Sequence, residues 1–359
     1  MVRAWVALLV LAGVCFGMAI VSRPIHVAAP VFPQSTQQSV SRVADLPWNP
    51  ATIRLWKLLS GSDPTAEQVR AAVRDGADLD SILDWSTDRH LRDDPELWKT
   101  SVPNYMYQFH WSALQLALLK HSASADRSAI AELIRAGADV NFRNRLGETV
   151  MAYALVGENT NQQSVRQLVD AGWRPADESE RIAVDIALGD GAVIDALLED
   201  GLAPNQALVV GAPPLLIAAR CNPDIDVFRR LVEAGALPSY EEFVDLYRPL
   251  DLHLVPPLVA AIETNPNPQV VAYLLDVADV SRLNDWLQST PLMAAASAGR
   301  SPEMLEVILQ YDPEINATND VGITALDYAN EDHVPEATRR FLREAGAKRG
   351  SEISREAEQ

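Results

Sequence analysis

The sequence is poor in cysteine and histidine, and this limits the chemistry that it can support. Its two cysteines, Cys15 and Cys221, are far apart, and the first lies in an apolar N-terminal run. The chain therefore cannot build a disulfide framework or a multi-cysteine metal cluster. The six histidines are scattered and lack the His-Glu-x-x-His spacing of a zinc-binding helix. We predict no metal site and no cofactor.

Motifs of the common enzyme classes are also missing. The sequence has no glycine-rich phosphate loop and no Gly-x-Ser-x-Gly elbow, so we predict a protein that is not an enzyme. An acidic stretch lacks the Asp-x-Asp-x-Asp-Gly spacing of a calcium loop, and we interpret it as a solvated charged segment. Its members are Asp80, Asp84, Asp88, Asp93 and Asp94.

Basic residues are scarce relative to acidic ones. Lys and Arg total 30 against 49 Asp and Glu, which gives a formal net charge of −19. Such a surface repels the phosphate backbone, so a nucleic-acid partner is not expected. A protein partner with a basic surface is favoured instead. The hydrophobic fraction of 48% is ordinary for a folded chain.

An apolar run near the N-terminus predicts export. Residues 4–21 carry no charge and would span about 27 Å as a helix, close to a bilayer core of roughly 30 Å. Residues 1–29 therefore read as a signal peptide, cleaved after Ala19 or Ala29, or as a membrane anchor. Because Arg3 precedes the run, the body should face away from the cytoplasm, either anchored in the inner membrane facing the periplasm or released into the periplasm. Residues 30–50 are rich in Pro, Ser and Gln and are predicted to be a flexible tether.

Two short patterns alternate along the rest of the chain. One is sharpest in Thr290-Pro291-Leu292-Met293-Ala294-Ala295, and the other is a short apolar helix that ends at a glycine such as Gly137. Self-similarity of this kind indicates a repeat architecture. The leucine-type position of the first pattern recurs with a period near 33 residues, at positions 114, 151, 184, 215, 258, 292 and 326.

These linked copies resemble the ankyrin-repeat family, whose signature is Thr-Pro-Leu-His followed by alanines and, later, a helix that ends in Gly-Ala. The resemblance covers about residues 50–348 and implies an all-α solenoid of about seven to eight helix-turn-helix repeats, preceded by the N-terminal apolar helix. No copy keeps the histidine of the signature, which leaves the family's Thr–His hydrogen bond in doubt. The residues in its position are Gln115, Ala152, Asp185, Leu216, Val259, Met293 and Asp327.

The expected repeat domain spans residues 51–348 and a charged tail spans 349–359. The first repeat is expected at about 51–80, and full repeats at 111–144, 145–177, 178–208, 209–239, 253–286, 287–320 and 321–348. Two short helices cannot bury enough apolar area alone, so neighbouring repeats must stack. Small residues should lie where the helices approach closely: Ala117, Ala154, Ala187, Ala218, Ala261, Ala295 and Ala329.

Two insertions, 81–110 and 238–254, are the candidate partner-binding segments. Both are rich in aromatic side chains, which are enriched in binding hot spots. The alternatives are that the first insertion caps the array and that the second is a solvated spacer. The candidate residues are Trp85, His90, Trp98, Tyr105, Tyr107 and Phe109 in the first insertion, and Tyr240, Phe243 and Tyr247 in the second.

The sequence thus predicts a non-catalytic scaffold of the cell envelope that binds a partner protein through its concave face and its insertions. One alternative is an immunity protein that neutralises a secreted bacterial toxin enzyme. Another is a small-ligand sensor or an enzyme that uses the aromatic and histidine residues of 81–110.

Overall fold

The computed structural model describes ten stretches of the chain, all within a compact unit that spans Asp45–Gln359. They are residues 49–60, 64–81, 111–119, 128–144, 147–157, 161–238, 255–278, 289–311, 314–330 and 334–357. The predicted leader and nearly all of the tether and of both insertions lie outside these residues. Their predictions are therefore not tested.

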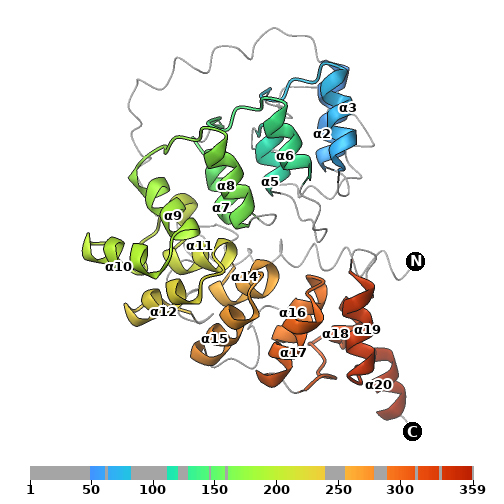
Figure 1. Ribbon diagram of the computed structural model, residues 1–359. Coiled ribbons are helices and arrows are strands. Elements are labelled where there is room, and N and C mark those ends of the chain that lie inside the picture. The colour runs from blue at the N-terminus through green and yellow to red at the C-terminus, as the bar shows by residue number, and fades with distance from the viewer. Residues whose placement is uncertain are drawn as a thin grey trace, which may run out of the picture. The chain divides into compact units, whose positions relative to one another are not determined.

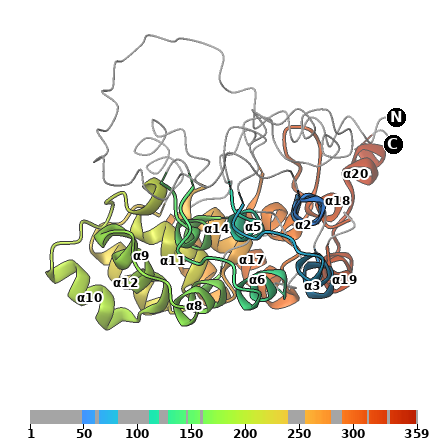
Figure 2. The ribbon, with the colours of Figure 1, turned by 90° about the horizontal axis from the view of Figure 1, so that it is seen from above.

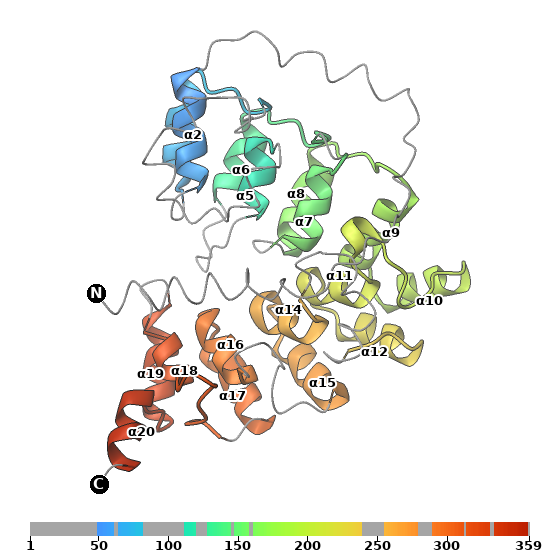
Figure 3. The same ribbon diagram turned by 180° about the vertical axis from the view of Figure 1, so that it is seen from behind.

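The described residues form helices that follow one another in pairs (Figures 1 and 3). The first helices of the pairs are α2 (Pro50–Ser60), α5 (Ala113–Leu119), α7 (Val150–Val156), α9 (Glu178–Leu188), α11 (Pro214–Cys221), α14 (Pro257–Thr264), α16 (Pro291–Ser297) and α18 (Ala325–Tyr328). The second helices are α3 (Ala66–Arg74), α6 (Ser128–Arg135), α8 (Gln162–Asp170), α10 (Gly191–Glu199), α12 (Ile225–Glu233), α15 (Pro268–Ala278), α17 (Pro302–Tyr311) and α19 (Glu336–Glu344). A 3-10 turn, η3 (Val209–Gly211), precedes α11. The prediction of an all-helical repeat fold is confirmed for these parts of the chain.

Successive pairs stack through both of their helices. Each first helix packs against the first helix of the next pair, from α2 on α5 through to α16 on α18. The second helices pack in the same way, except that α8 packs mainly against α9. Seen from above in Figure 2, the first helices and the second helices form two rows. The alanines predicted at close approaches are all buried, Ala117 at 7% exposure and the other six at 0%.

The C-terminal tail contains a helix that the sequence analysis does not predict. α20 (Gly350–Ala357) begins directly after the last pair, and its start is bonded to that pair. The backbone N–H of Gly350 donates to Asp327 Oδ2 at 2.8 Å, and the backbone N–H of Arg349 donates to Glu352 at 2.8 Å. Since these acceptors satisfy N–H groups at the first turn, which have no partner within the helix, the charged sequence can still form a helix there.

Buried or half-buried polar side chains bridge the C-terminal ends of successive first helices. Asn222, which follows α11, donates to Ile186 O and Gly189 O at the end of α9, both at 2.8 Å. Asn265 makes the corresponding pair of bonds from the end of α14 to the end of α11, and Arg300 makes them from the end of α16 to the end of α14. We call Asn222, Asn265 and Arg300 the polar ladder. It satisfies the carbonyls that each helix leaves unpaired at its C-terminus.

A second set of bridges is made by asparagines in the turns that follow the second helices, and two of them, Asn141 and Asn205, lie four residues after Gly137 and Gly201. Asn141 donates to Gly172 O at 3.2 Å and accepts from the backbone N–H of Arg174 at 2.7 Å. Asn205 and Asn316 make the same two bonds to the following repeat. A side-chain amide suits this place because it has both a donor and an acceptor.

Asp80 occupies the same position in the first repeat. It accepts from the backbone N–H of Asp139 at 2.9 Å, as the asparagines do, but an ionised carboxylate cannot donate to the glycine carbonyl. Burial raises the pKa of Asp80 above its ordinary value. The aspartate is therefore a poorer bridge than the asparagines of the later repeats.

We predict that Asp80→Asn stabilises the full chain by about 0.5–1.5 kcal/mol at neutral pH, because the amide gains a bond to Gly137 O. A raised pKa in the folded state means that folding disfavours the ionised carboxylate at pH values above that pKa. The advantage of Asn should therefore shrink as the pH falls through the folded-state pKa of Asp80. Urea unfolding followed by circular dichroism at several pH values measures both effects. The reverse change, Asn141→Asp, is the matched control and should destabilise.

Candidate partner-binding site

The hairpin between α6 and α7 is built by local hydrogen bonds. The backbone N–H of Asn144 donates to Glu148 O, and its side-chain Oδ1 accepts from the Glu148 N–H, each at 2.9 Å. Gly147, with φ of +82°, supplies the turn conformation that a side chain would disfavour. Thr149 then caps α7 by accepting from the Ala152 N–H at 3.0 Å. Arg143 pairs with Thr149 in an isolated antiparallel bridge, which fixes its backbone at the edge of the hairpin.

The hairpin before α18 repeats this arrangement. The backbone N–H of Asn319 donates to Ile323 O at 3.0 Å, and Gly322 has φ of +79°. Thr324 caps α18 by accepting from the Asp327 N–H at 3.3 Å. The shared order is Asn, then Gly three residues later and Thr five residues later. This spacing is visible in the sequence, and it is a signal that the repeat analysis missed.

Substitutes partly replace the histidine that the repeats lack. Gln115 donates to Glu148 O of the next hairpin at 3.0 Å and accepts from the Ser112 N–H at 3.1 Å. Asp327 accepts from the Thr324 N–H at 3.1 Å. In these two repeats the N-terminal cap of the first helix is therefore kept, although the family's histidine is missing. An amide or a carboxylate takes the place of the imidazole.

A polar network connects Trp111, at the start of the second repeat, to the hairpin between α6 and α7. Trp111 Nε1 donates to Tyr153 Oη at 2.8 Å, and that hydroxyl donates to Glu148. Burial and the Glu148 carboxylate raise the pKa of Tyr153 well above its ordinary value, so the hydroxyl stays protonated and keeps donating. Trp111, at the edge of the first insertion, is 5% exposed. This ring is therefore structural.

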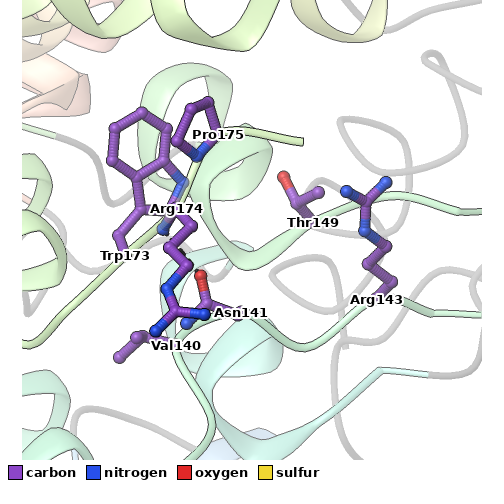
Figure 4. Close-up of a pocket in the computed structure, with 7 residues that line it drawn as sticks. All are labelled: Val140, Asn141, Arg143, Thr149, Trp173, Arg174 and Pro175. Atoms are coloured by element: carbon purple, nitrogen blue, oxygen red, sulfur yellow. Dashed lines mark hydrogen bonds between the residues drawn. The ribbon is translucent and has the colours of Figure 1, made fainter. Parts of the chain in front are cut away.

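A pocket of about 220 Å³ lies between this hairpin and the turn that follows α8 (Figure 4). Two of its lining residues, Val140 and Thr149, are buried, while Arg143, Arg174 and Pro175 are exposed. In Figure 4, the guanidinium group of Arg174 lies beside Asn141, and Arg143 lies on the other side of Thr149. The pocket thus has a cationic group at each end. Its lining residues are Val140, Asn141, Arg143, Thr149, Trp173, Arg174 and Pro175.

Arg143 and Arg174 differ from most arginines in the described part of the chain because neither forms an ion pair there. Arg166, Arg220, Arg349 and Arg355 also lack an ion pair among the described residues but do not line the pocket. The paired arginines are Arg54, Arg70, Arg74, Arg135, Arg181, Arg229, Arg230, Arg339, Arg340 and Arg343. In a chain with a net charge of −19, two uncompensated guanidinium groups at one pocket form a local exception.

The carboxylates near the pocket already accept hydrogen bonds from within the fold. Glu180, 2% exposed, accepts from the Thr149 hydroxyl and from the Ala176 N–H. Asp139 accepts from the Asn141 N–H at 2.9 Å. These acids are held by internal donors, whereas the two arginines remain available to a ligand. Trp173 Nε1 adds a buried indole donor with no hydrogen-bond partner among the described residues.

The pocket was not predicted from the sequence, and the residues that were predicted cannot be compared with it. All nine candidates, from Trp85 to Tyr247, lie outside the described residues and stay predictions. Of the acidic stretch, only Asp80 is described, and it bridges two repeats. No group of three His, Cys, Asp or Glu residues in the described ranges is arranged to hold a metal ion. No helix among these residues is long and apolar enough to cross a membrane.

Stacked helix pairs, hairpins and bridging side chains define a helical repeat protein. The ankyrin-repeat family model matches residues 288–320, the length of one repeat, and this match supports an ankyrin-repeat protein. The other described helix pairs have the same pairing, and two of the earlier ones have the same asparagine bridge as Asn316. No curated protein matches the chain. Ankyrin repeats are typically non-catalytic interaction modules, so the matched repeat suggests a role in protein–protein interaction.

Proposed function

We propose that this chain is an exported adaptor that binds a partner protein through the pocket at Arg143 and Arg174. The observation that carries the proposal is a pair of exposed arginines, on neighbouring hairpin and turn segments, that form no ion pair with the described residues. Exposed polar groups held by a rigid scaffold are typical of binding surfaces. The uncharged run at residues 4–21 supports export, with the repeat domain facing the periplasm.

Site-specific photo-crosslinking tests the binding surface. A photo-reactive amino acid in place of Pro175, which is exposed and lines the pocket, should give a discrete adduct with one protein in intact cells. The same amino acid in place of Glu199, exposed on α10, is the matched control and should not give that adduct. Adducts at Glu199 but none at Pro175 would contradict the proposed surface.

The cellular location is tested independently with the full chain fused to alkaline phosphatase, which is active only outside the cytoplasm. We expect activity from the fusion, and loss of activity when the run at 4–21 is interrupted by charged residues. An inactive, stable fusion would contradict export. The narrower role of an immunity protein adds one requirement: the crosslinked partner must be a secreted enzyme whose activity falls when the chain binds.

A further inference from the structure

We infer that the pocket binds an acidic segment of the partner, with one carboxylate at Arg143 and another at Arg174. The inference rests on the proposed function and adds the chemistry of the ligand. It differs from what net charge alone predicts, because a chain at −19 favours a basic partner surface. The two arginines give the pocket a positive charge, opposite in sign to the net charge of the chain. The charges next to a bound side chain determine whether its desolvation is compensated.

The two guanidinium groups lie at opposite ends of the lining residues, with Thr149 between them (Figure 4). A single small anion would therefore contact one arginine, whereas an extended segment with two carboxylates can reach both. Guanidinium groups bind carboxylates through paired, charge-assisted hydrogen bonds. The geometry thus favours a peptide segment over a free ion.

The size of the pocket leads to the same conclusion. Its volume of about 220 Å³ is below the roughly 300–1,000 Å³ of pockets that bury drug-sized ligands. It suits one or two side chains of a segment whose backbone passes over the surface. Val140, Trp173 and Pro175 give the pocket an apolar wall, against which the carbon chain of a glutamate can pack.

Competition within the chain does not block this site. Two acids that contact lining residues, Glu180 and Asp139, accept hydrogen bonds from Thr149, Ala176 and Asn141. An incoming carboxylate therefore does not have to break an existing ion pair of either arginine. Its desolvation cost is offset by two cations that have no other acidic partner in the described residues.

The test is a selection of displayed random peptides on the full-length protein. Peptides that bind the wild type are screened against the double variant Arg143→Glu/Arg174→Glu and against Arg355→Glu. The last variant reverses the charge of an arginine on α20 that is exposed and forms no ion pair with the described residues, and it is the matched control. We expect peptides that bind the wild type and the control but bind the double variant roughly 10- to 100-fold more weakly. These peptides should be enriched in Asp and Glu, and their binding should weaken as salt is added.

A charge swap separates a lost contact from a damaged fold. When the acidic residues of a selected peptide are replaced by Lys, the new peptide should bind the double variant better than it binds the wild type. Selected peptides that are rich in Lys and Arg would overturn the inference, as would a selection with no peptide that depends on the two arginines. If photo-crosslinks form at Pro175 and the peptides are basic, only the inference fails. If acidic peptides bind but no protein crosslinks, the proposed function fails.

Discussion

Replacing Asn265 with Ala should destabilise the full chain by about 2–4 kcal/mol, one of the largest effects expected of a single substitution in this fold. Asn265 is fully buried in the polar ladder. Its amide donates to Ala219 O at 3.0 Å and to Asn222 O at 2.8 Å, and its side-chain oxygen accepts from the Asn267 N–H at 3.0 Å. Alanine would leave two buried carbonyls and one N–H without partners, and the loss would be felt in two neighbouring repeats.

Urea unfolding followed by circular dichroism measures the effect of Asn265→Ala. The control is Gln269→Ala in α15. Its side chain is exposed, and its hydrogen bond to Asn267 is made by the backbone N–H, which alanine keeps. We expect the control to change stability by less than about 0.5 kcal/mol. Equal midpoints for the two variants would show that the polar ladder contributes little, and the stacking would then have to be attributed to apolar packing alone.

The repeat architecture could be predicted from the sequence because it rests on recurring local patterns. The alternation of Leu-Ala helices with glycine-ended helices gave the pairing of α16 with α17, and the buried alanines followed from the same pattern. The first repeat was predicted at about residues 51–80, and the structure has the helix pair α2 and α3 there. Short-range periodicity determines such elements, so a single sequence was sufficient to identify them.

The pocket could not be predicted in the same way because it depends on two segments that lie some thirty residues apart in the chain. Arg143 belongs to the hairpin before α7, and Arg174 follows α8. Nothing in either local sequence distinguishes these arginines from those that form ion pairs. The distinction comes from the lack of an ion-paired acid among the described residues, which is a property of the folded array. The net charge of −19 also directed attention to basic partners and away from this site.

The junction between the third and fourth repeats shows how one long-range contact replaces a repeated local one. Four residues after Gly172, where Asn141 and Asn205 stand in their repeats, the chain has Ala176, which cannot form the bridge. Glu180 of α9 accepts from the Ala176 N–H at 2.6 Å and from the hydroxyl of Thr149. One buried carboxylate therefore connects α9 to the turn of the third repeat and to the cap of α7. It also holds Thr149, a lining residue of the pocket.

Glu180→Leu should therefore destabilise the chain by about 2–4 kcal/mol, because the Ala176 N–H and the Thr149 hydroxyl both lose a buried acceptor. Hydrogen exchange gives a local readout: the amide of Ala176 should exchange faster in the variant than in the wild type. Glu199→Leu, at an exposed position of α10, controls for the loss of one negative charge and should change neither quantity measurably. If Ala176 keeps its slow exchange in Glu180→Leu, the carboxylate is not what connects these two repeats, and the packing of α8 on α9 must hold the junction instead.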